Sequence, residues 1–129
     1  MMITKDDDIR RNNDVALLRE YWLKNPTSKQ LVLVYKFVTW KLRLSPIQKK
    51  NKIAYKQGET ITVKRWDTSN NSCGSGINVA AYDWCKFTKL RSQRVIQLEI
   101  RICDIVSMPK RSRGYVEGKF RVKRAVVLT

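Results

Sequence analysis

The segment from Arg94 to Ile102 constrains the fold more than any other part of the sequence. Its even-numbered positions from Ile96 onward are isoleucine or leucine, whereas the odd positions carry Gln97, Glu99 and Arg101. Such alternation puts the apolar side chains on one face of a β-strand and the polar ones on the other. The chain is therefore expected to build a sheet with one face on a core and one face in water.

Further segments are expected to be strands of that sheet. Leu31 to Trp40 is apolar on both faces in its first half, which indicates a central position. Lys52 to Tyr55 and Thr60 to Arg65 flank Gln57-Gly58, a pattern that predicts a hairpin. Ile77 to Val79 is expected to be a short extended piece.

Lys119 to Leu128 is expected to be the last strand. Phe120 and Val122 are predicted to point inward. Arg124 breaks the alternation, which predicts a bulge or a change of face near Ala125. The side chains predicted to point outward are Lys119, Arg121 and Lys123.

Two helices are expected. One runs from Asp14 to Lys24, with Asn13 or Asp14 as its N-cap and Pro26 ending it. The other covers 80–90 and places three residues on one face, namely Ala81, Trp84 and Cys85.

These elements predict one α+β domain, built on a mainly antiparallel sheet of about five or six strands. Residues 1–25 are expected to form an N-terminal arm and helix, and residues 26–129 the basic α+β body. A chain of 129 residues fits one domain. No apolar run is long enough for a membrane helix, and the acidic start of the chain does not resemble a signal peptide.

The charge is unevenly distributed along the sequence. Residues 1–25 hold five bases and five acids, so the whole net charge of +16 lies on residues 26–129. Self-repulsion of this kind is relieved by an anionic partner. Candidate partners are DNA or RNA, acidic protein surfaces such as those of capsid proteins, and anionic lipid.

The residue types argue against catalysis. The sequence holds no histidine, so a Ser-His-Asp triad, a Cys-His pair and a histidine proton shuttle are all excluded. Cys73, Cys85 and Cys103 form no C-x-x-C pair and are expected to be buried free thiols. We therefore expect no enzyme activity, no metal and no cofactor, although Glu99 or Cys73 would be the candidates in a degenerate enzyme.

The expected anion-binding surface combines two basic loops, at 41–52 and 110–113, with a basic stripe on the last strands. Bases and aromatic residues also alternate at Trp40-Lys41, Lys64-Arg65-Trp66 and Lys86-Phe87, where rings could stack on nucleobases. The predicted binding residues are Lys41, Arg43, Lys49, Lys50, Lys52, Lys64, Arg65, Arg101, Lys110, Arg111, Arg113, Arg121 and Lys123.

The glycine-rich segment 73–76 has neither P-loop nor dinucleotide-binding spacing. We interpret it as a tight turn before the helix at 80–90, with an anion at that helix N-terminus as the alternative.

The segment Cys73-Gly74-Ser75-Gly76-Ile77-Asn78-Val79 resembles a motif, C-x-x-G-I/L-H-V, of small uncharacterised domains in phages and large DNA viruses. In that family a Y-x-x-G element precedes the motif, and D-I-V-x-x-P and K-x-R-V elements follow it. This chain offers 55–58, 104–109 and 119–122 in the same order, so the resemblance spans about residues 31–128. The family's histidine is Asn78 here, so any role of that histidine is lost.

The order of elements also looks like half of an ADP-ribosyltransferase domain, but the arginine, Ser-Thr and glutamate signatures of that fold are missing. The resemblance implies a viral origin and a non-enzymatic role. Our leading hypothesis is a minor capsid or virion-internal protein that binds acidic protein surfaces or packaged DNA. The alternatives are a free nucleic-acid-binding regulatory module and a degenerate ADP-ribosyltransferase-like domain. The expected location is the virion or the host cytoplasm or nucleus.

Overall fold

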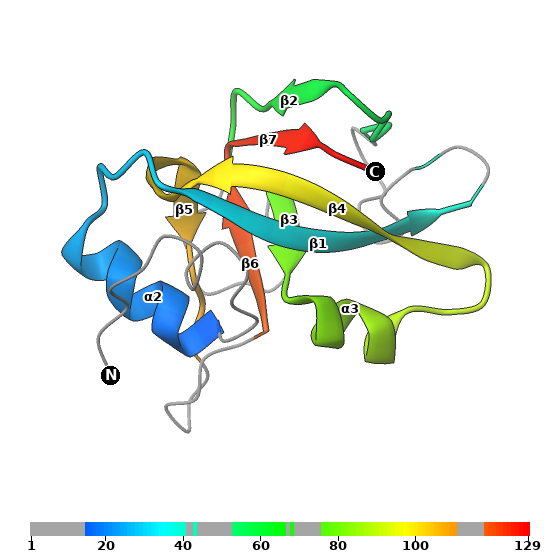
Figure 1. The fold of residues 1–129 in the computed structure, drawn as a ribbon, viewed down its shortest axis with the longest axis horizontal. Helices are drawn as coiled ribbons and strands as arrows, with labels where there is room; N and C mark the ends of the chain where they lie inside the picture. The colour runs from blue at the N-terminus through cyan, green and yellow to red at the C-terminus, as the bar shows by residue number, and fades with distance from the viewer. Residues whose placement is uncertain (1–14, 41–42, 44–52, 67, 69–75, 111–117) are drawn as a thin grey trace.

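The computed structural model describes residues 15–40, 43, 53–66, 68, 76–110 and 118–129 (Figure 1). Within them lie one antiparallel sheet of seven strands, two α-helices and a 3-10 turn, so the predicted α+β class is confirmed. The elements are α2 (Val15–Lys24), β1 (Leu31–Thr39), β2 (Thr60–Thr62), β3 (Ile77–Ala80), α3 (Tyr82–Thr88), β4 (Gln93–Arg101), η1 (Ile102–Asp104), β5 (Ile105–Ser107), β6 (Lys119–Val122) and β7 (Arg124–Val127).

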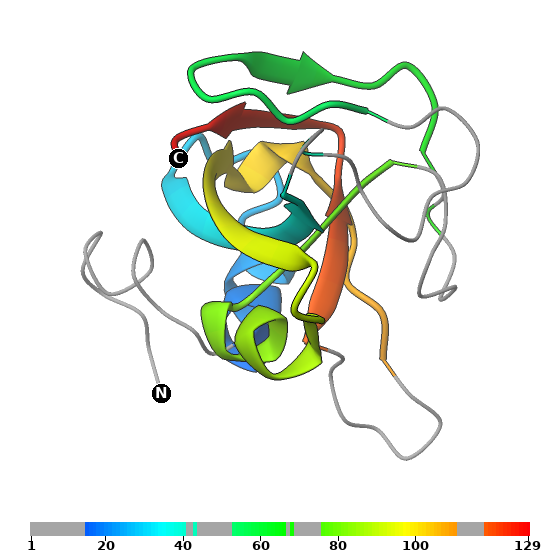
Figure 2. The same ribbon diagram turned by 90° about the vertical axis from the view of Figure 1, so that its right-hand side faces the viewer.

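The strand order is β2-β7-β4-β1-β3-β6-β5, and β1 is central, as its apolar first half predicted. β1 pairs with β4 along its whole length, from Leu31 opposite Arg101 to Thr39 opposite Gln93. β6 and β7 are separated only by Lys123, yet β6 pairs with β3 and β7 pairs with β4. In the sheet, β4, β1 and β3 lie between β7 and β6. The one-residue link between β6 and β7 therefore forces the sheet to curl around its core, as Figure 2 shows.

The inward face of the curled sheet holds the main core. β4 contributes the predicted alternating residues, all of them fully buried. Leu18 of α2 packs into the same core from one side, and Arg19 fixes the helix by donating from Nε to the Met108 carbonyl at 3.1 Å. Each large aliphatic side chain buried in this way contributes about 1.5–3 kcal/mol. The strand residues of this core include Val32, Val34, Val38, Ile77, Val79, Ile96, Leu98, Ile100, Phe120, Val122, Ala125 and Val127.

A second, smaller cluster lies on the other face of the sheet, under α3 (Figure 1). It joins Phe37, Ala80 and Cys85, and the Trp84 ring stacks on Phe37 with 5.9 Å between ring centroids. The predicted inward face of the helix at 80–90 is thus confirmed for Trp84 and Cys85, although the helix itself spans only Tyr82–Thr88.

The predicted hairpin around Gln57-Gly58 is wrong in its pairing. A turn is present, because the Glu59 amide donates to the Lys56 carbonyl at 3.1 Å and Gly58 has a φ of 86°. However, β2 pairs with β7, with Ile61 opposite Ala125. The physical reason is that β7 is a strand whose inward residues Ala125 and Val127 belong to the core. The predicted partner segment instead contributes Tyr55 to the core from a non-strand conformation.

The change of face predicted near Ala125 is confirmed and falls at Lys123. Phe120 and Val122 point to the core before it, and Ala125 and Val127 point to the core after it. The inward positions therefore shift from even to odd numbers across the break between β6 and β7.

The outward orientation predicted for Lys119 and Arg121 does not make them exposed. Both are buried, with 7% and 1% of their surface accessible, because Trp84 of α3 lies against Lys119 and Ser107 of the neighbouring strand β5 contacts Arg121. Arg121 donates from Nη2 to the Ser107 hydroxyl at 3.0 Å, and the Lys119 ammonium lies 5.8 Å from the Trp84 ring centroid. The predicted alternation of inward and outward side chains in β6 is therefore present, but the outward side chains are buried as well.

The predicted N-cap residues Asn13 and Asp14 lie outside the described residues, and the helix is described from Val15. Pro26 follows its end, as predicted. The last residue of the glycine-rich segment, Gly76, is buried at the start of β3 with a φ of 126°, so this segment leads into a strand before the helix.

Candidate nucleic-acid interface

Of the thirteen predicted binding residues, the structure describes seven. Six of the predicted positions lie outside the described residues, namely Lys41, Lys49, Lys50, Lys52, Arg111 and Arg113. The described ones do not share one surface. Lys110 is exposed after β5, and the stripe expected from Arg101, Arg121 and Lys123 does not form, because Arg121 is buried and β4 and β6 are not neighbours.

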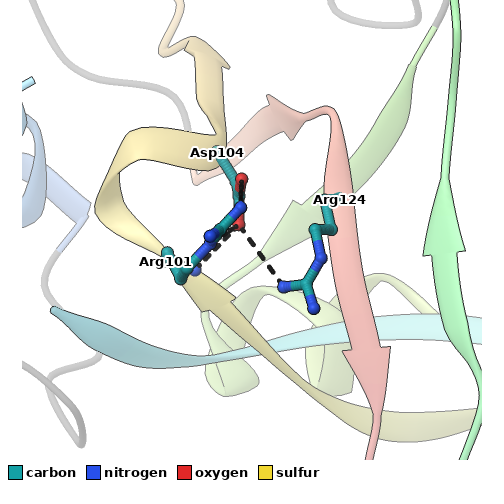
Figure 3. A network of polar contacts seen from close by, with 3 residues as sticks. All are labelled: Arg101, Asp104 and Arg124. Atoms are coloured by element: carbon teal, nitrogen blue, oxygen red, sulfur yellow. Dashed lines mark hydrogen bonds and ion pairs between the residues drawn. The ribbon is translucent and has the colours of Figure 1, made fainter. Parts of the chain in front are cut away.

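Arg101 has a structural role (Figure 3). Asp104 in η1 is completely buried and accepts hydrogen bonds from the Arg101 backbone amide at 3.2 Å, from Nε at 3.0 Å and from Nη2 at 3.0 Å. Arg124 on β7 approaches the same carboxylate at 3.9 Å. The hydrogen bonds and charge of Asp104 raise the pKa of Arg101. The pair thus fixes the turn between β4 and β5 rather than offering a free cation.

Lys64, Arg65 and Lys123 form a small group around Trp66. Lys64 and Arg65 are exposed, and the Lys123 ammonium lies 5.6 Å from the Trp66 ring centroid. Trp66 is 40% exposed and its Cβ packs close to Gly76. We call these four residues the Trp66 group, which agrees with the predicted alternation of bases and rings at this place.

Arg43, the remaining predicted residue, follows the C-terminal end of β1, and Arg94 pairs with Val38 near that same end. It adopts a left-handed backbone with a φ of 53°, which is costly for a side chain other than glycine. Several hydrogen bonds hold it there: its amide donates to Thr39, its carbonyl accepts from Tyr55, and its guanidinium donates to the carbonyls of Tyr55 and Thr129.

Arg94 brings a second guanidinium to the same place. It lies against the Trp40 ring, 5.1 Å from the centroid, and Trp40 stays 58% exposed. Partial burial, and then the like charge of Arg94, lower the pKa of Arg43. Among the described residues, no side-chain carboxylate pairs with either arginine. The Arg43 guanidinium does donate to an oxygen of Thr129, the last residue of the sequence. Since the charge of Arg94 acts on Arg43, an anion bound at this place would be stabilised by both guanidinium groups.

The connection from α3 to β4 adds more basic residues and apolar side chains near the C-terminal end of β1. Phe87 is 84% exposed and Leu90 is 65% exposed. A tight turn joins them to β4, since the Gln93 amide donates to the Leu90 carbonyl at 3.0 Å. In Figure 1 the end of β1, the start of β4 and the connection from α3 lie together on the right. We define the basic–aromatic end as Trp40, Arg43, Lys86, Phe87, Lys89, Leu90, Arg91 and Arg94.

No family model, curated protein or solved structure matches the chain. The resemblance to phage and virus domains therefore stays a prediction.

Most of the basic–aromatic end was missed as a binding site by reasoning from the sequence. The sequence predicts Trp40 and Phe87 as rings next to basic residues, but it does not predict Arg94 as a binding residue. A signal for it exists: Arg94 continues the even-numbered, inward positions of β4, so an arginine there had to lie at the rim of the core. Its closeness to Arg43 depends on the tertiary fold and has no signal in the sequence.

One more cation is held inside the fold. Lys36 is buried on the core face of β1, donates from Nζ to the Asn78 carbonyl at 2.8 Å and lies 5.2 Å from the Tyr55 ring centroid. The Tyr55 hydroxyl is buried with no hydrogen-bond partner among the described residues. Burial raises the pKa of Tyr55, so this phenol is neutral at physiological pH.

The thiols match their expected burial only in part. Cys85 is buried, and burial raises its pKa to about 12, against weaker opposing effects of Lys36 and a backbone hydrogen bond. Cys103 is only half-buried, and Cys73 lies outside the described residues. In the described ranges no three His, Cys, Asp or Glu residues gather as a metal site would require, and no helix there is long and apolar enough to cross a membrane.

Proposed function

We propose that this chain is a non-enzymatic nucleic-acid-binding protein that contacts its ligand through the basic–aromatic end. The observation that supports this most is the Arg94 guanidinium against the exposed Trp40 ring, with the charge of Arg94 also acting on Arg43. Phosphates need closely spaced cations, and nucleobases need exposed aromatic faces. This end of the molecule offers both within a few residues of each other.

The arrangement favours a phosphate ligand over simple solvation of the charge. The hydrogen bonds of Arg43 to Tyr55 and Thr129 hold its guanidinium in place before a ligand arrives. A preorganised guanidinium loses little side-chain entropy on binding.

The test is equilibrium binding of the whole protein to a fluorescent oligonucleotide at low salt. The variant Arg91→Gln/Arg94→Gln is expected to lose at least about tenfold in affinity, or about 1.4 kcal/mol. The matched control is Lys24→Gln/Lys29→Gln, which removes two exposed bases at the opposite end of β1. Failure of the unchanged protein to bind at low salt, or equal losses in both variants, would contradict the proposal.

On the resemblance noted in the sequence, we further propose that this binding serves inside a virus particle, as a minor capsid or virion-internal component in contact with packaged nucleic acid. Mass spectrometry of purified particles from the source virus tests this part separately. Presence of the chain at a defined copy number supports it. Absence from purified particles leaves the free regulatory module as the setting of the same activity.

A second candidate function is docking on an acidic protein surface. Phe87 and Leu90 favour it, because two neighbouring apolar side chains so strongly exposed beside bases also suit a protein partner. A glutamate-rich polypeptide that competes with the oligonucleotide at equal charge concentration would favour this candidate.

A further inference from the structure

We infer that the basic–aromatic end binds single-stranded nucleic acid, with unpaired bases stacked on Trp40 and Phe87, and this inference rests on the proposed function. The reason is the combination of two exposed rings, one with the Arg94 guanidinium against it and the other next to Lys86 in the sequence. A duplex hides its base faces in its own stack, so only a single strand can use such rings.

Trp40 is the better defined of the two rings. The residue is anchored through its backbone, because its amide donates to the Ser92 carbonyl at 3.4 Å, just beyond the last β1–β4 pair, Thr39 opposite Gln93. The Arg94 guanidinium lies against the ring at 5.1 Å from the centroid. More than half of the residue is nevertheless accessible, at 58%. A ring oriented by a cation and still exposed is suited to stacking on a base while the cation contacts the adjoining phosphate.

Phe87 is the second ring, and it lies on α3 and not on a strand. It lies near the end of α3, is 84% exposed, and follows Lys86 directly in the sequence. A phenylalanine has no polar atom that would account for such exposure, and the buried face of α3 is formed instead by Trp84 and Cys85. Lys86, Lys89 and Arg91 are close to Phe87 in the sequence and would supply cations for the backbone of the same nucleic-acid strand.

The Trp66 group provides an internal comparison. Trp66 is also partly exposed and also has a cation, Lys123, against its ring. Its Cβ packs 3.3 Å from the place a side chain on Gly76 would occupy, which shows that it is packed onto the start of β3. No second strongly exposed ring is found beside it in the described part of the chain.

The experiment compares affinities for a labelled oligonucleotide of about 12 nucleotides, single-stranded and as a duplex with its complement, since one binding module covers about 4–16 nucleotides. The unchanged protein is expected to bind the single strand at least about tenfold more tightly. Trp40→Ala and Phe87→Ala should each lose about tenfold for the single strand and remain within about twofold for the duplex. Trp66→Ala is the matched control and should change neither affinity.

The outcomes separate this inference from the proposed function. Equal binding of both oligonucleotides, with no effect of Trp40→Ala or Phe87→Ala, overturns the inference and leaves phosphate-based binding in place. No binding of either oligonucleotide overturns both. Poly-glutamate that competes as well as the single strand also overturns the inference, because it carries charge without bases. Should Trp40→Ala fail to fold, Phe87→Ala and the ratio of affinities of the unchanged protein still decide the result, since the Phe87 side chain is largely exposed.

Discussion

Asp104 shows how this basic chain uses one of its few acids. Its carboxylate lies at zero accessibility where β4, η1 and β7 meet, and Arg101 and Arg124 both approach it (Figure 3). A buried carboxylate of this kind is stable only while it is paired and hydrogen-bonded. The residue therefore belongs to the framework of the fold.

We predict that Asp104→Asn lowers the free energy of unfolding by about 2–3 kcal/mol, because the charge-assisted hydrogen bonds from Arg101 are lost. Urea unfolding followed by circular dichroism measures the change. Asp83→Asn is the control, since Asp83 is exposed on α3, and its cost should stay within about 0.5 kcal/mol. Equal costs for the two variants would contradict a structural role of Asp104.

The buried Cys85 thiol gives a prediction about pH. Its pKa is raised from 9.0 to about 12 by burial, so the folded state holds a proton that the unfolded state releases above pH 9. The stabilising contribution of the neutral thiol is complete below pH 9 and is lost as the pH rises toward 12. The loss amounts to about 1.4 kcal/mol per pH unit at most.

The measurement is the urea midpoint between pH 7 and 11 for the unchanged protein and for Cys85→Ala. Tyr55, whose pKa is also raised by burial, acts in the same direction and is common to both proteins. The unchanged protein should lose stability more steeply above pH 9 than Cys85→Ala. Parallel curves would show that Cys85 does not carry the effect.

At the scale of elements, the contact between α3 and β6 depends on a glycine. A Cβ added at Gly118 would lie 2.4 Å from Cδ1 and 2.8 Å from Cγ of Trp84, the ring that stacks on Phe37 and lies under Lys119. There is no room for a methyl group unless the ring moves.

We therefore predict that Gly118→Ala costs about 1–3 kcal/mol of stability and changes the tryptophan emission spectrum, because Trp84 must shift. Gly58→Ala is the comparison: nothing lies within 4 Å of the added Cβ, and its cost is limited to a positive φ of 86°, about 1–2 kcal/mol. Its emission spectrum should stay unchanged. An unchanged spectrum in Gly118→Ala would show that Trp84 packs differently.

The comparison of sequence and structure is clearest for individual elements. The alternation in β4, the central position of β1 and the inward face of α3 were predictable, since each follows from local spacing of apolar residues. The pairing of β2 with β7 was not, because a turn at Gly58 does not determine which strand lies beside β2. The burial of Arg121 was not either, since alternation tells which residues share a face but not what covers it.

For the candidate site, only the residue types were predictable from the sequence, and not their arrangement. Exposed rings next to bases were visible at Trp40 and Phe87, and the excess of positive charge was visible in the composition. The placement of Arg43 relative to Arg94 depends on the left-handed backbone at Arg43 and on the pairing of β4 with β1. Local patterns do not determine either feature.

For the whole molecule, the net charge of +16 is distributed between framework and surface. Lys36, Lys119 and Arg121 are buried, and each contacts an aromatic ring, a carbonyl or a hydroxyl. The cations left at the surface of the described residues include those of the basic–aromatic end and the Trp66 group. Counting charge in the sequence therefore includes at least three cations that the fold buries.

The central claim is that the basic–aromatic end carries the binding of nucleic acid, and the salt dependence of affinity tests it most directly. The slope of log affinity against log salt should become shallower by about 0.7 for each cation that contacts a phosphate of a single strand. The variant Lys86→Gln/Lys89→Gln/Arg91→Gln/Arg94→Gln should therefore show a clearly shallower slope than the unchanged protein. Lys24→Gln/Lys29→Gln should keep the original slope. Identical slopes for the unchanged protein and the fourfold variant would contradict the claim.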